Sequence, residues 1–361
     1  MKHLFISLIL IITVFLSKAQ IADYEVATLL NKGDFFELEK RYPVVKDDLL
    51  SPMLKSMSES LLNYYFNKPE EAYKSITNLL ENYQEEMGFE NSCEMVLLKG
   101  YIMADLGMFS DIYVMHNEYL SQLEPYLSPE FVNTFKELIN LSGILVKLPA
   151  QKIVSPSRDV EISMEIRKVS DKGNLIFVPV SINGKNTQFI FDSGAGKNLI
   201  SESFAKEHNI RITSDSILTS GVKKGYSKIG TTDSIMIGDI VYYNPVFIVA
   251  PTNEEVDTVF KVDTVLGIEF MKSLKGIQIF PQKELIILSN TSSQLPKSGK
   301  NMIMNGDQPL LLGFWGKEKL IFQFDTGNAG ADLHETFYTK NKKWVEKKGK
   351  KHLLNQVVTG D

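Results

Sequence analysis

Two similar segments lie 133 residues apart (325 − 192) in this sequence, and they constrain the fold more than any other feature. In each, an apolar run ends in an acid, a hydroxyl residue and a glycine, at residues 192–194 and 325–327. Both acids have a turn nine residues before them and an acid-hydroxyl-phenylalanine run starting ten residues after them: residues 183–184 and 202–204 around the first, 316–317 and 335–337 around the second. Chance rarely produces one triplet twice with the same flanks, so we interpret the segments as an internal duplication.

The two acids, Asp192 and Asp325, are the candidate catalytic residues. A carboxylate at the end of an apolar strand loses hydration, so it needs hydrogen bonds or a function to justify its position. The glycine allows a sharp turn that brings its own amide close to the acid, and the hydroxyl can tie the loop to a neighbour. The residues expected to support the two loops in this way are Ser193, Gly194, Thr326 and Gly327.

The N-terminal part, from Ile21 to about Val146, carries apolar residues at helical spacing. Three helix-helix corners, at Gly33, Lys68 and Gly107, lie 35 and 39 residues apart (68 − 33 and 107 − 68), which is close to the period of paired-helix repeats. Residues 64–83 resemble a tetratricopeptide unit. Such a domain can bind a protein partner in a groove, or it can serve as a packing or spacer domain.

After Pro149 the apolar period changes from 3.6 to 2, and short β-branched runs alternate with turn residues. This pattern predicts a compact β barrel or sandwich. The expected strands are residues 176–182, 187–191, 233–237, 241–249, 276–280 and 285–288.

Residues from about 160 to 290 resemble a complete lobe of the retropepsin-like family, as found in bacterial secreted aspartic proteases. The resemblance is carried by a hairpin, the loop at Asp192 and the run Val265-Leu266-Gly267. It implies that Leu266 and Gly267 pack beneath the catalytic loop.

The same resemblance implies that residues 221–237 form a flap over the substrate. Gly221, Gly225 and Gly230 would give this flap mobility, and Tyr226 is a candidate substrate-facing residue.

The second copy departs from the family in two ways. Asn328 stands where the family usually has Ala, Ser or Thr. The first lobe uses 75 residues from Asp192 to Gly267 (267 − 192), whereas 36 residues follow Asp325 (361 − 325). We therefore expect a truncated second lobe here, and a natural protein that continues past Asp361.

The resemblance implies an aspartic endopeptidase that acts on peptide or protein substrates and needs no metal or organic cofactor. Two related lobes would bring Asp192 and Asp325 together around one water, where adjacent carboxyl groups share a proton and titrate as a coupled pair. Two alternatives stay open. One is an inactive binding protein, and the other is a homodimer in which Asp192 of two copies forms the site.

Other function classes lack support in the sequence. The 39 basic and 44 acidic residues give a net charge of −5, so there is no basic excess to attract nucleic acid. The five histidines show no H-E-x-x-H spacing, and no G-x-S-x-G occurs, which disfavours zinc and serine hydrolases. Residues 194–198 do not meet the phosphate-loop spacing. The seven lysines between 340 and 351 are interpreted as a solvated surface.

The first residues predict export. Lys2 and His3 precede the apolar run 4–16, and Ser17-Lys18-Ala19 provides a small-x-small cleavage site before Gln20. No later run reaches the roughly 20 apolar residues of a membrane helix. The single cysteine, Cys93, is interpreted as a buried small hydrophobe rather than a lipid or disulfide site. We expect a periplasmic or secreted protein without stable membrane insertion.

The predicted fold class is therefore multidomain, with an all-α helical-repeat domain followed by all-β retropepsin-like lobes. The expected segments are a signal peptide at 1–19, the helical domain at 20–148, a linker at 149–159, the first lobe at 160–290 and a partial second lobe at 300–361.

Overall fold

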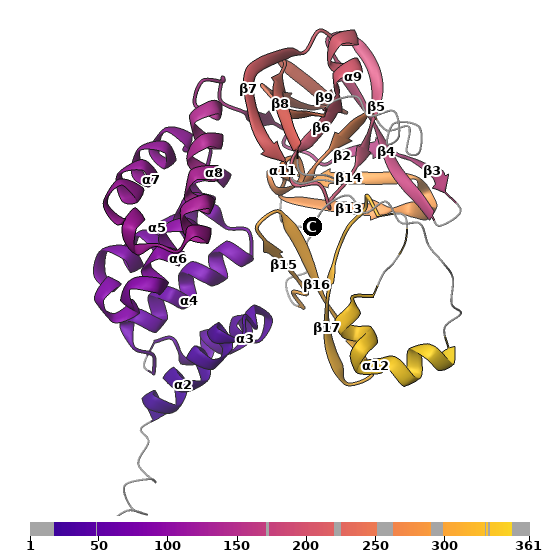
Figure 1. The fold of residues 1–361 in the computed structure, drawn as a ribbon. Helices are drawn as coiled ribbons and strands as arrows, with labels where there is room; N and C mark the ends of the chain where they lie inside the picture. Colours follow the sequence, from indigo (N-terminus) through magenta and orange to yellow (C-terminus); the bar gives the residue numbers. More distant parts are fainter. Residues whose placement is uncertain are drawn as a thin grey trace, which may run out of the picture. The chain divides into compact units, whose positions relative to one another are not determined.

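The computed structural model describes residues 18–47, 49–170, 173–219, 225–250, 263–289, 299–328, 330 and 333–348. The chain forms two compact units, one of Met1–Pro149 with Pro296–Gln323 and one of Ala150–Leu295 with Phe324–Asp361 (Figure 1). The apolar run of the expected signal peptide, Gly221 of the expected flap and the residues around Asp361 lie outside the described part of the chain.

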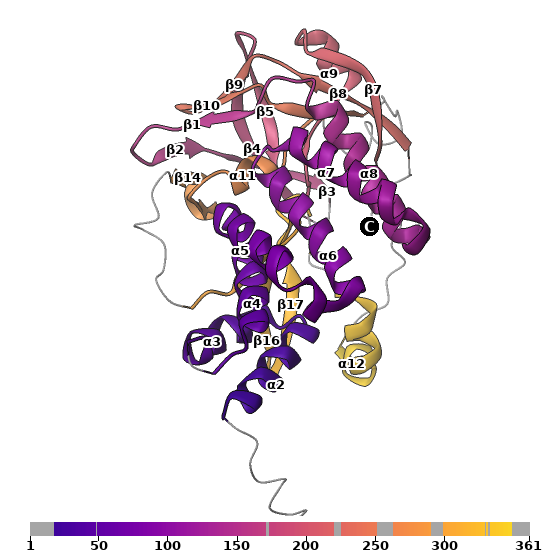
Figure 2. The ribbon, with the colours of Figure 1, turned by 90° about the vertical axis from the view of Figure 1, so that its left-hand side faces the viewer.

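The first unit is built mainly from helices, in which each of α4 to α7 contacts the next helix along the chain (Figure 2). All three expected corners lie between helices, and Gly33 and Gly107 adopt left-handed φ values of 63° and 71° there. None of the helices in the described segments is long and apolar enough to cross a membrane. The helices are α2 (Lys18–Asn31), α3 (Phe35–Val45), α4 (Pro52–Tyr65), α5 (Pro69–Asn82), α6 (Gln84–Asp105), α7 (Phe109–Leu123) and α8 (Pro129–Leu145), with a 3-10 helix at Glu124–Tyr126.

Helix ends and burial follow from the sequence in this unit. Pro52, Pro69 and Pro129 each occupy the first helical position, where a missing N–H costs nothing. The side chain of Asp34 accepts a hydrogen bond from Glu37 N and caps α3. Cys93 is 1% exposed, as expected of a buried small hydrophobe, and its Sγ accepts a hydrogen bond from the Tyr119 hydroxyl.

A three-stranded antiparallel sheet belongs to the same unit as these helices. It consists of β15 (Met302–Asn305), β16 (Gln308–Trp315) and β17 (Glu318–Gln323). Residues 302–323, expected to open the second lobe, thus pack with the N-terminal helices.

The second unit contains a curled eleven-stranded sheet, in the order β1-β10-β9-β4-β5-β12-β6-β11-β8-β7 with β3 paired to β4. A smaller sheet has the order β13-β14-β2. The strands are β1 (Lys152–Val154), β2 (Val160–Ser163), β3 (Glu165–Ser170), β4 (Gly173–Ile182), β5 (Lys185–Phe191), β6 (Asn198–Ser201), β7 (Arg211–Thr219), β8 (Gly225–Thr231), β9 (Ser234–Ile237), β10 (Ile240–Tyr243), β11 (Val246–Ala250), β12 (Thr264–Leu266), β13 (Gly276–Phe280) and β14 (Leu285–Ser289), and the helices are α9 (Glu202–Glu207), α11 (Ile268–Lys272) and α12 (Glu335–Lys348), with a 3-10 helix at Pro281–Lys283.

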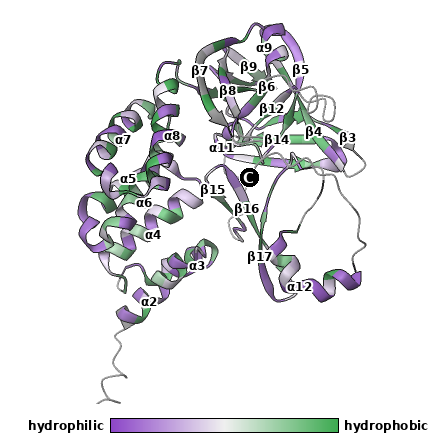
Figure 3. Cartoon of the chain, in the orientation of Figure 1, coloured by the Kyte–Doolittle hydropathy of each residue, from purple (hydrophilic) through white to green (hydrophobic). Residues whose placement is uncertain are grey.

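The core of this unit lies inside the curled sheet. Phe189, Phe247 and Phe270 are fully buried there, and hydrophobic residues line β6 and β12 (Figure 3). The prediction of a helical N-terminal region followed by a β-rich region is confirmed. Two details differ from the expectation. The predicted strand 241–249 is divided at Asn244, which has a φ of 49°, and residues 152–154 of the expected linker pair with β10 as strand β1.

Candidate active site

The two acid-hydroxyl-glycine loops meet in the second unit and are joined by crossed hydrogen bonds. The Ser193 amide donates to Thr326 Oγ1 at 2.9 Å, and the Thr326 amide donates to Ser193 Oγ at 3.0 Å. Ser193 Oγ then donates to the Phe324 carbonyl at 2.8 Å, and Thr326 Oγ1 donates to the Phe191 carbonyl at 2.6 Å. Every bond has a counterpart in the other loop, so the loops are related by a local pseudo-two-fold symmetry.

This symmetry brings the carboxyl groups of Asp192 and Asp325 together. A Cβ placed on Gly194 would lie 2.3 Å from Cγ of Asp325, and one placed on Gly327 would lie 2.2 Å from Cγ of Asp192. No side chain fits at such distances, so each loop needs a glycine where it passes the other loop's acid. Each glycine amide also donates to the carboxylate of its own loop, at 2.8 Å in both loops.

The electrostatics of Asp192 reflect this crowding. Burial first, and then the charge and hydrogen bond of the neighbouring Asp325 carboxyl, raise the pKa of Asp192 to about 6, although the amides of Gly194 and Ala195 oppose the shift. A carboxyl group with this pKa exchanges its proton in mildly acidic solution. The pair can therefore hold one proton and one negative charge, which is the state that general acid–base chemistry requires.

The first loop is supported from below by the run that ends in Leu266-Gly267. The Asp192 amide donates to the Leu266 carbonyl at 3.1 Å. A Cβ on Gly267 would lie 2.7 Å from the Ala195 carbonyl oxygen, so the two backbones pack in direct contact. The side chain of Leu266 is fully buried.

Asn198 is a supporting residue that the sequence reasoning missed. It is fully buried, its Oδ1 accepts from the Gly267 amide at 3.0 Å, and its Nδ2 donates to the Val246 carbonyl at 3.2 Å. It thereby ties three strands together behind the loop. Its signal in the sequence was an amide side chain at the start of an apolar strand, a position that needs internal hydrogen bonds.

An ion pair beside the first loop was also missed. Lys197 Nζ lies 3.1 Å from Glu269 Oε1, joining the end of the loop to α11. Gln151 Nε2 contacts the same oxygen at 3.5 Å. Glu269 is 72 residues from Lys197 and 118 residues from Gln151, so no local sequence pattern predicts these contacts.

The second loop has less support than the first. The Asn328 amide donates to the Asp325 backbone carbonyl at 3.3 Å, and Asn328 Oδ1 accepts from the Gly330 amide at 3.0 Å. The corresponding residue of the first loop, Ala195, donates to the carboxylate of Asp192 instead. Within the described residues, β17 pairs with β16 alone, whereas β5 pairs with both β4 and β12.

The expected flap is partly wrong. A hairpin does form from β7 and β8, in which Thr219 pairs with Gly225 and Leu218 with Tyr226. Tyr226 is 74% exposed. The C-terminal part of the expected range is β9, whose Ile235 and Ile237 are fully buried in the barrel.

Gly230 was expected to supply mobility, but it lies in the barrel interior. A Cβ there would be 2.9 Å from Val249 Cγ2. This glycine accommodates a neighbouring side chain.

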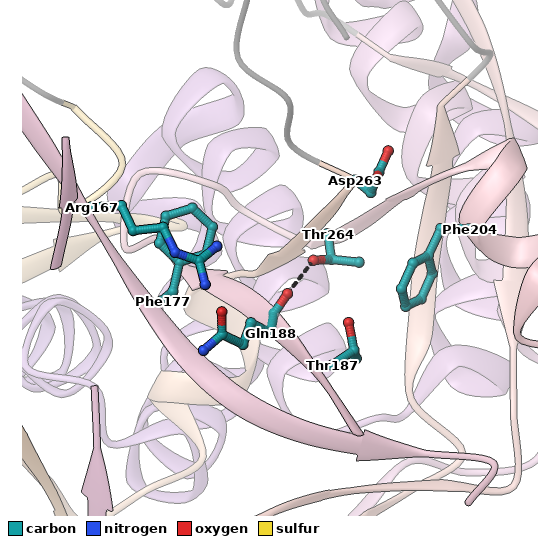
Figure 4. Close-up of a pocket in the computed structure, with 7 residues that line it drawn as sticks. All are labelled: Arg167, Phe177, Thr187, Gln188, Phe204, Asp263 and Thr264. Carbon is teal, nitrogen blue, oxygen red and sulfur yellow. Dashed lines mark hydrogen bonds between the residues drawn. The ribbon is translucent and has the colours of Figure 1, made fainter. Parts of the chain in front are cut away.

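A cavity of about 340 Å³ lies elsewhere on the second unit (Figure 4). Across its floor, Thr264 Oγ1 donates to the Gln188 carbonyl at 2.7 Å, and Arg167 stacks over the Phe177 ring at 4.1 Å. None of the predicted site residues lines it. The lining residues are Arg167, Phe177, Thr187, Gln188, Phe204, Asp263 and Thr264. No group of three or more His, Cys, Asp or Glu side chains in the described ranges could hold a metal ion.

Comparisons with known proteins found one matching family and one similar solved structure. Residues 178–270 match the model of the aspartyl protease family, a range that includes Asp192 and Leu266-Gly267 and ends before the second triplet. A solved structure described as a retropepsin-like aspartic protease from Rickettsia conorii is similar at 18% identity with a TM-score of 0.26, covering 38% of this chain and 92% of that chain. A comparison with curated protein sequences gave no match. The family match shows that residues 178–270 are similar to the aspartyl protease family.

Proposed function

We propose that this chain is an aspartic endopeptidase in which Asp192 and Asp325 form one catalytic dyad. The observation that carries the proposal is the approach of the two carboxyl groups, with each loop's glycine in contact with the other loop's acid. The raised pKa of Asp192 supports it, because a carboxyl group that keeps its proton in mild acid can act beside an ionised partner.

The proposed reaction uses one proton shared by the pair. In mild acid Asp192 carries this proton and hydrogen bonds to the scissile carbonyl oxygen, while Asp325 accepts a proton from the attacking water. The water oxygen bonds to the carbonyl carbon while Asp192 gives its proton to the carbonyl oxygen, and a tetrahedral diol results. The C–N bond then breaks as Asp325 gives the nitrogen the proton that it took from the water. Asp192 takes a proton back from one diol hydroxyl as the new carbonyl forms, so the pair returns to its singly protonated state.

The test changes each acid to its amide. Asp192→Asn and Asp325→Asn keep the shape of the side chain and remove its ionisation, so each should lower peptide cleavage by at least about a thousandfold. Each should also abolish inhibition by a diol-mimicking transition-state analogue, because such a compound binds the dyad. Asp233→Asn is the matched control, since Asp233 is exposed and pairs with Arg211 at 2.8 Å.

The two other hypotheses predict different outcomes of the same experiment. For a homodimer of first lobes, Asp325→Asn keeps its activity and cleavage falls on dilution. For a binding module, the wild type cleaves no peptide between mildly acidic and neutral pH. The hydrogen bonds between Ser193 and Thr326 within one chain favour the single-chain dyad. Cleavage of a mixed peptide library at two protein concentrations separates the three.

We also propose that the protein is exported to the periplasm or beyond. The support is the charged start, the apolar run 4–16 and the site Ser17-Lys18-Ala19. Mass spectrometry of the protein from its native cells should find Gln20 as the first residue. An intact Met1 on protein from the cytoplasmic fraction would contradict export.

A further inference from the structure

The sheet β15–β17 shares a hydrophobic core with the first helices of the chain. Ile303 of β15 is 5% exposed and lies in one cluster with Phe35 and Phe36 of α3. Leu310 and Leu312 of β16 pack against the same cluster. The sheet is therefore anchored on the helices by apolar contacts as well as by its own hydrogen bonds.

Two ion pairs also join the sheet β15–β17 and its leading residue to the helix α3 and its cap. Lys319 of β17 hydrogen bonds to Asp34, the residue that caps α3, and its ammonium group lies 5.7 Å from the centre of the Phe36 ring. Lys300, just before β15, hydrogen bonds to Glu39 Oε1 at 2.5 Å. Burial alone would raise the pKa of Asp34, but hydrogen bonds from Lys319 and from the Glu37 amide hold it below its usual value.

The second catalytic loop begins where this anchored sheet ends. Strand β17 stops at Gln323, and Phe324 and Asp325 follow directly. In the first half of the duplication, β5 precedes Asp192 and is held by β12, through the pairs Val265↔Ile190 and Leu266↔Phe191. Strand β17 has no such second neighbour in the described part of the chain, but its sheet is held by helices.

We propose that α2–α4 are an intramolecular scaffold that holds β15–β17 and, through the direct chain connection from Gln323 to Asp325, supports the second catalytic loop. The proposal rests on the dyad proposed above. It gives the helical domain a role inside the enzyme, and it makes Ile303, Glu39 and Lys300 positioning residues that act through β17.

The experiment uses the full chain and reverses one ion pair. Glu39→Lys and Lys300→Glu each place like charges together, whereas the double variant restores an attractive pair in the opposite sense. Each single variant should lower kcat about two- to fivefold with KM nearly unchanged, and the double variant should recover most of the loss. Ile303→Ala opens the shared core and should lower kcat by about tenfold or more. Asp34 is left unchanged, because its substitution would also remove the cap of α3.

Hydrogen exchange provides a readout that does not depend on activity. Amides of residues 318–323 should exchange faster in both single variants and in Ile303→Ala, and return toward the wild-type rate in the double variant. Reversal of the Glu124–Lys136 pair, which lies at 2.8 Å on the helices away from the sheet, should change neither exchange at 318–323 nor kcat.

The possible failures are distinct. A wild type that cleaves no peptide would refute the proposed function, and hydrogen exchange together with an NMR titration of Asp192 would still test the scaffold. Unchanged exchange at 318–323 in the single variants and in Ile303→Ala would overturn the scaffold, as would a kcat that the double variant fails to restore.

Discussion

The hairpins before the two acids share a register but bury opposite faces. In β4–β5, Val178 pairs with Phe189 and Ile182 with Lys185. In β16–β17, Leu311 pairs with Phe322 and Trp315 with Glu318, so every partner is shifted by 133 residues. The helices α9 and α12 begin at Glu202 and Glu335, with the same offset.

The environments of the two hairpins differ. Phe189 is fully buried and Val178 is 1% exposed, because their face of β4–β5 lines the barrel. The equivalent face of β16–β17 leaves Phe322 and Trp315 each 39% exposed, and the opposite face, with Leu310 and Leu312, packs on the helices. A shared sequence pattern thus preserves register, while the neighbouring elements decide which face becomes a core.

The two equivalent phenylalanines, Phe189 and Phe322, should differ in how much they contribute to the free energy of unfolding. Phe189→Ala should lower the free energy of unfolding of the second unit by about 3–5 kcal/mol, because it leaves a cavity in a closed core. Phe322→Ala should cost less than about 1 kcal/mol, since its ring is already partly in water. Chemical denaturation of both variants measures the difference. Equal costs would mean that the two faces are covered to the same degree.

Unlike the two phenylalanines, the two loop glycines should have equal effects on activity when they are replaced. Gly194→Ala and Gly327→Ala each force a methyl group into the opposite carboxyl group, so each should lower kcat/KM by about a hundredfold, or about 2.7 kcal/mol. Gly107→Ala is the control for backbone strain alone, because this glycine has a φ of 71° with open space around it and lies between α6 and α7. A loss of kcat/KM in only one of the two variants would show that the two loops are not equivalent.

The crossed hydrogen bonds between the two loops should contribute to stability as one network. Ser193→Ala and Thr326→Val each remove hydrogen bonds to the other loop and leave a buried amide without its acceptor, so each should cost about 1–3 kcal/mol of stability. The double variant should cost less than the sum, because the two hydroxyls share the same network. Additive costs in thermal denaturation would argue against a shared network.

The titration of Asp192 should depend on the neighbouring Asp325. In Asp325→Asn the pKa of Asp192 should fall below about 6, because the neighbouring negative charge is removed while burial remains. Wild-type activity should decline as the pH rises through about 6, since Asp192 then loses the proton that the proposed reaction needs. Carbon NMR of the Asp192 carboxyl measures the first effect and a pH–rate profile the second. An unchanged Asp192 pKa in the variant would show that the acids do not interact.

The sequence predicts the local parts of this molecule well. The matched runs at 202–204 and 335–337 coincide with the starts of α9 and α12, and the predicted strand 276–280 coincides with β13. A turn signal at Asn244-Pro245 was present inside the predicted strand 241–249 and was outweighed by the apolar run around it. The expected flap extended too far, into β9. Ile235 and Ile237 follow the alternation of any half-buried strand, so the sequence pattern does not separate a flap strand from a strand of the barrel.

Contacts between distant residues account for most of what the sequence left open. Lys319 and Asp34 are separated by 285 residues, and neither is unusual in its local context. Asn198 bonds to residues 48 and 69 positions away. Such contacts depend on the assembled tertiary structure rather than on local propensity, which is why the packing of 302–323 on the helices could not be anticipated.

The separation between Asp34 and Lys319 has a consequence for biosynthesis. At about 5–20 residues per second, a ribosome needs about 15–60 s to make the intervening chain. During that time the apolar surface around Phe35 and Phe36 lacks its packing partners Ile303, Leu310 and Leu312. A nascent chain that stops before residue 325 carries only half of the proposed dyad. We expect chains stalled on the ribosome before residue 300 to show fast exchange at α3 and no proteolysis, because they lack both β15–β17 and Asp325.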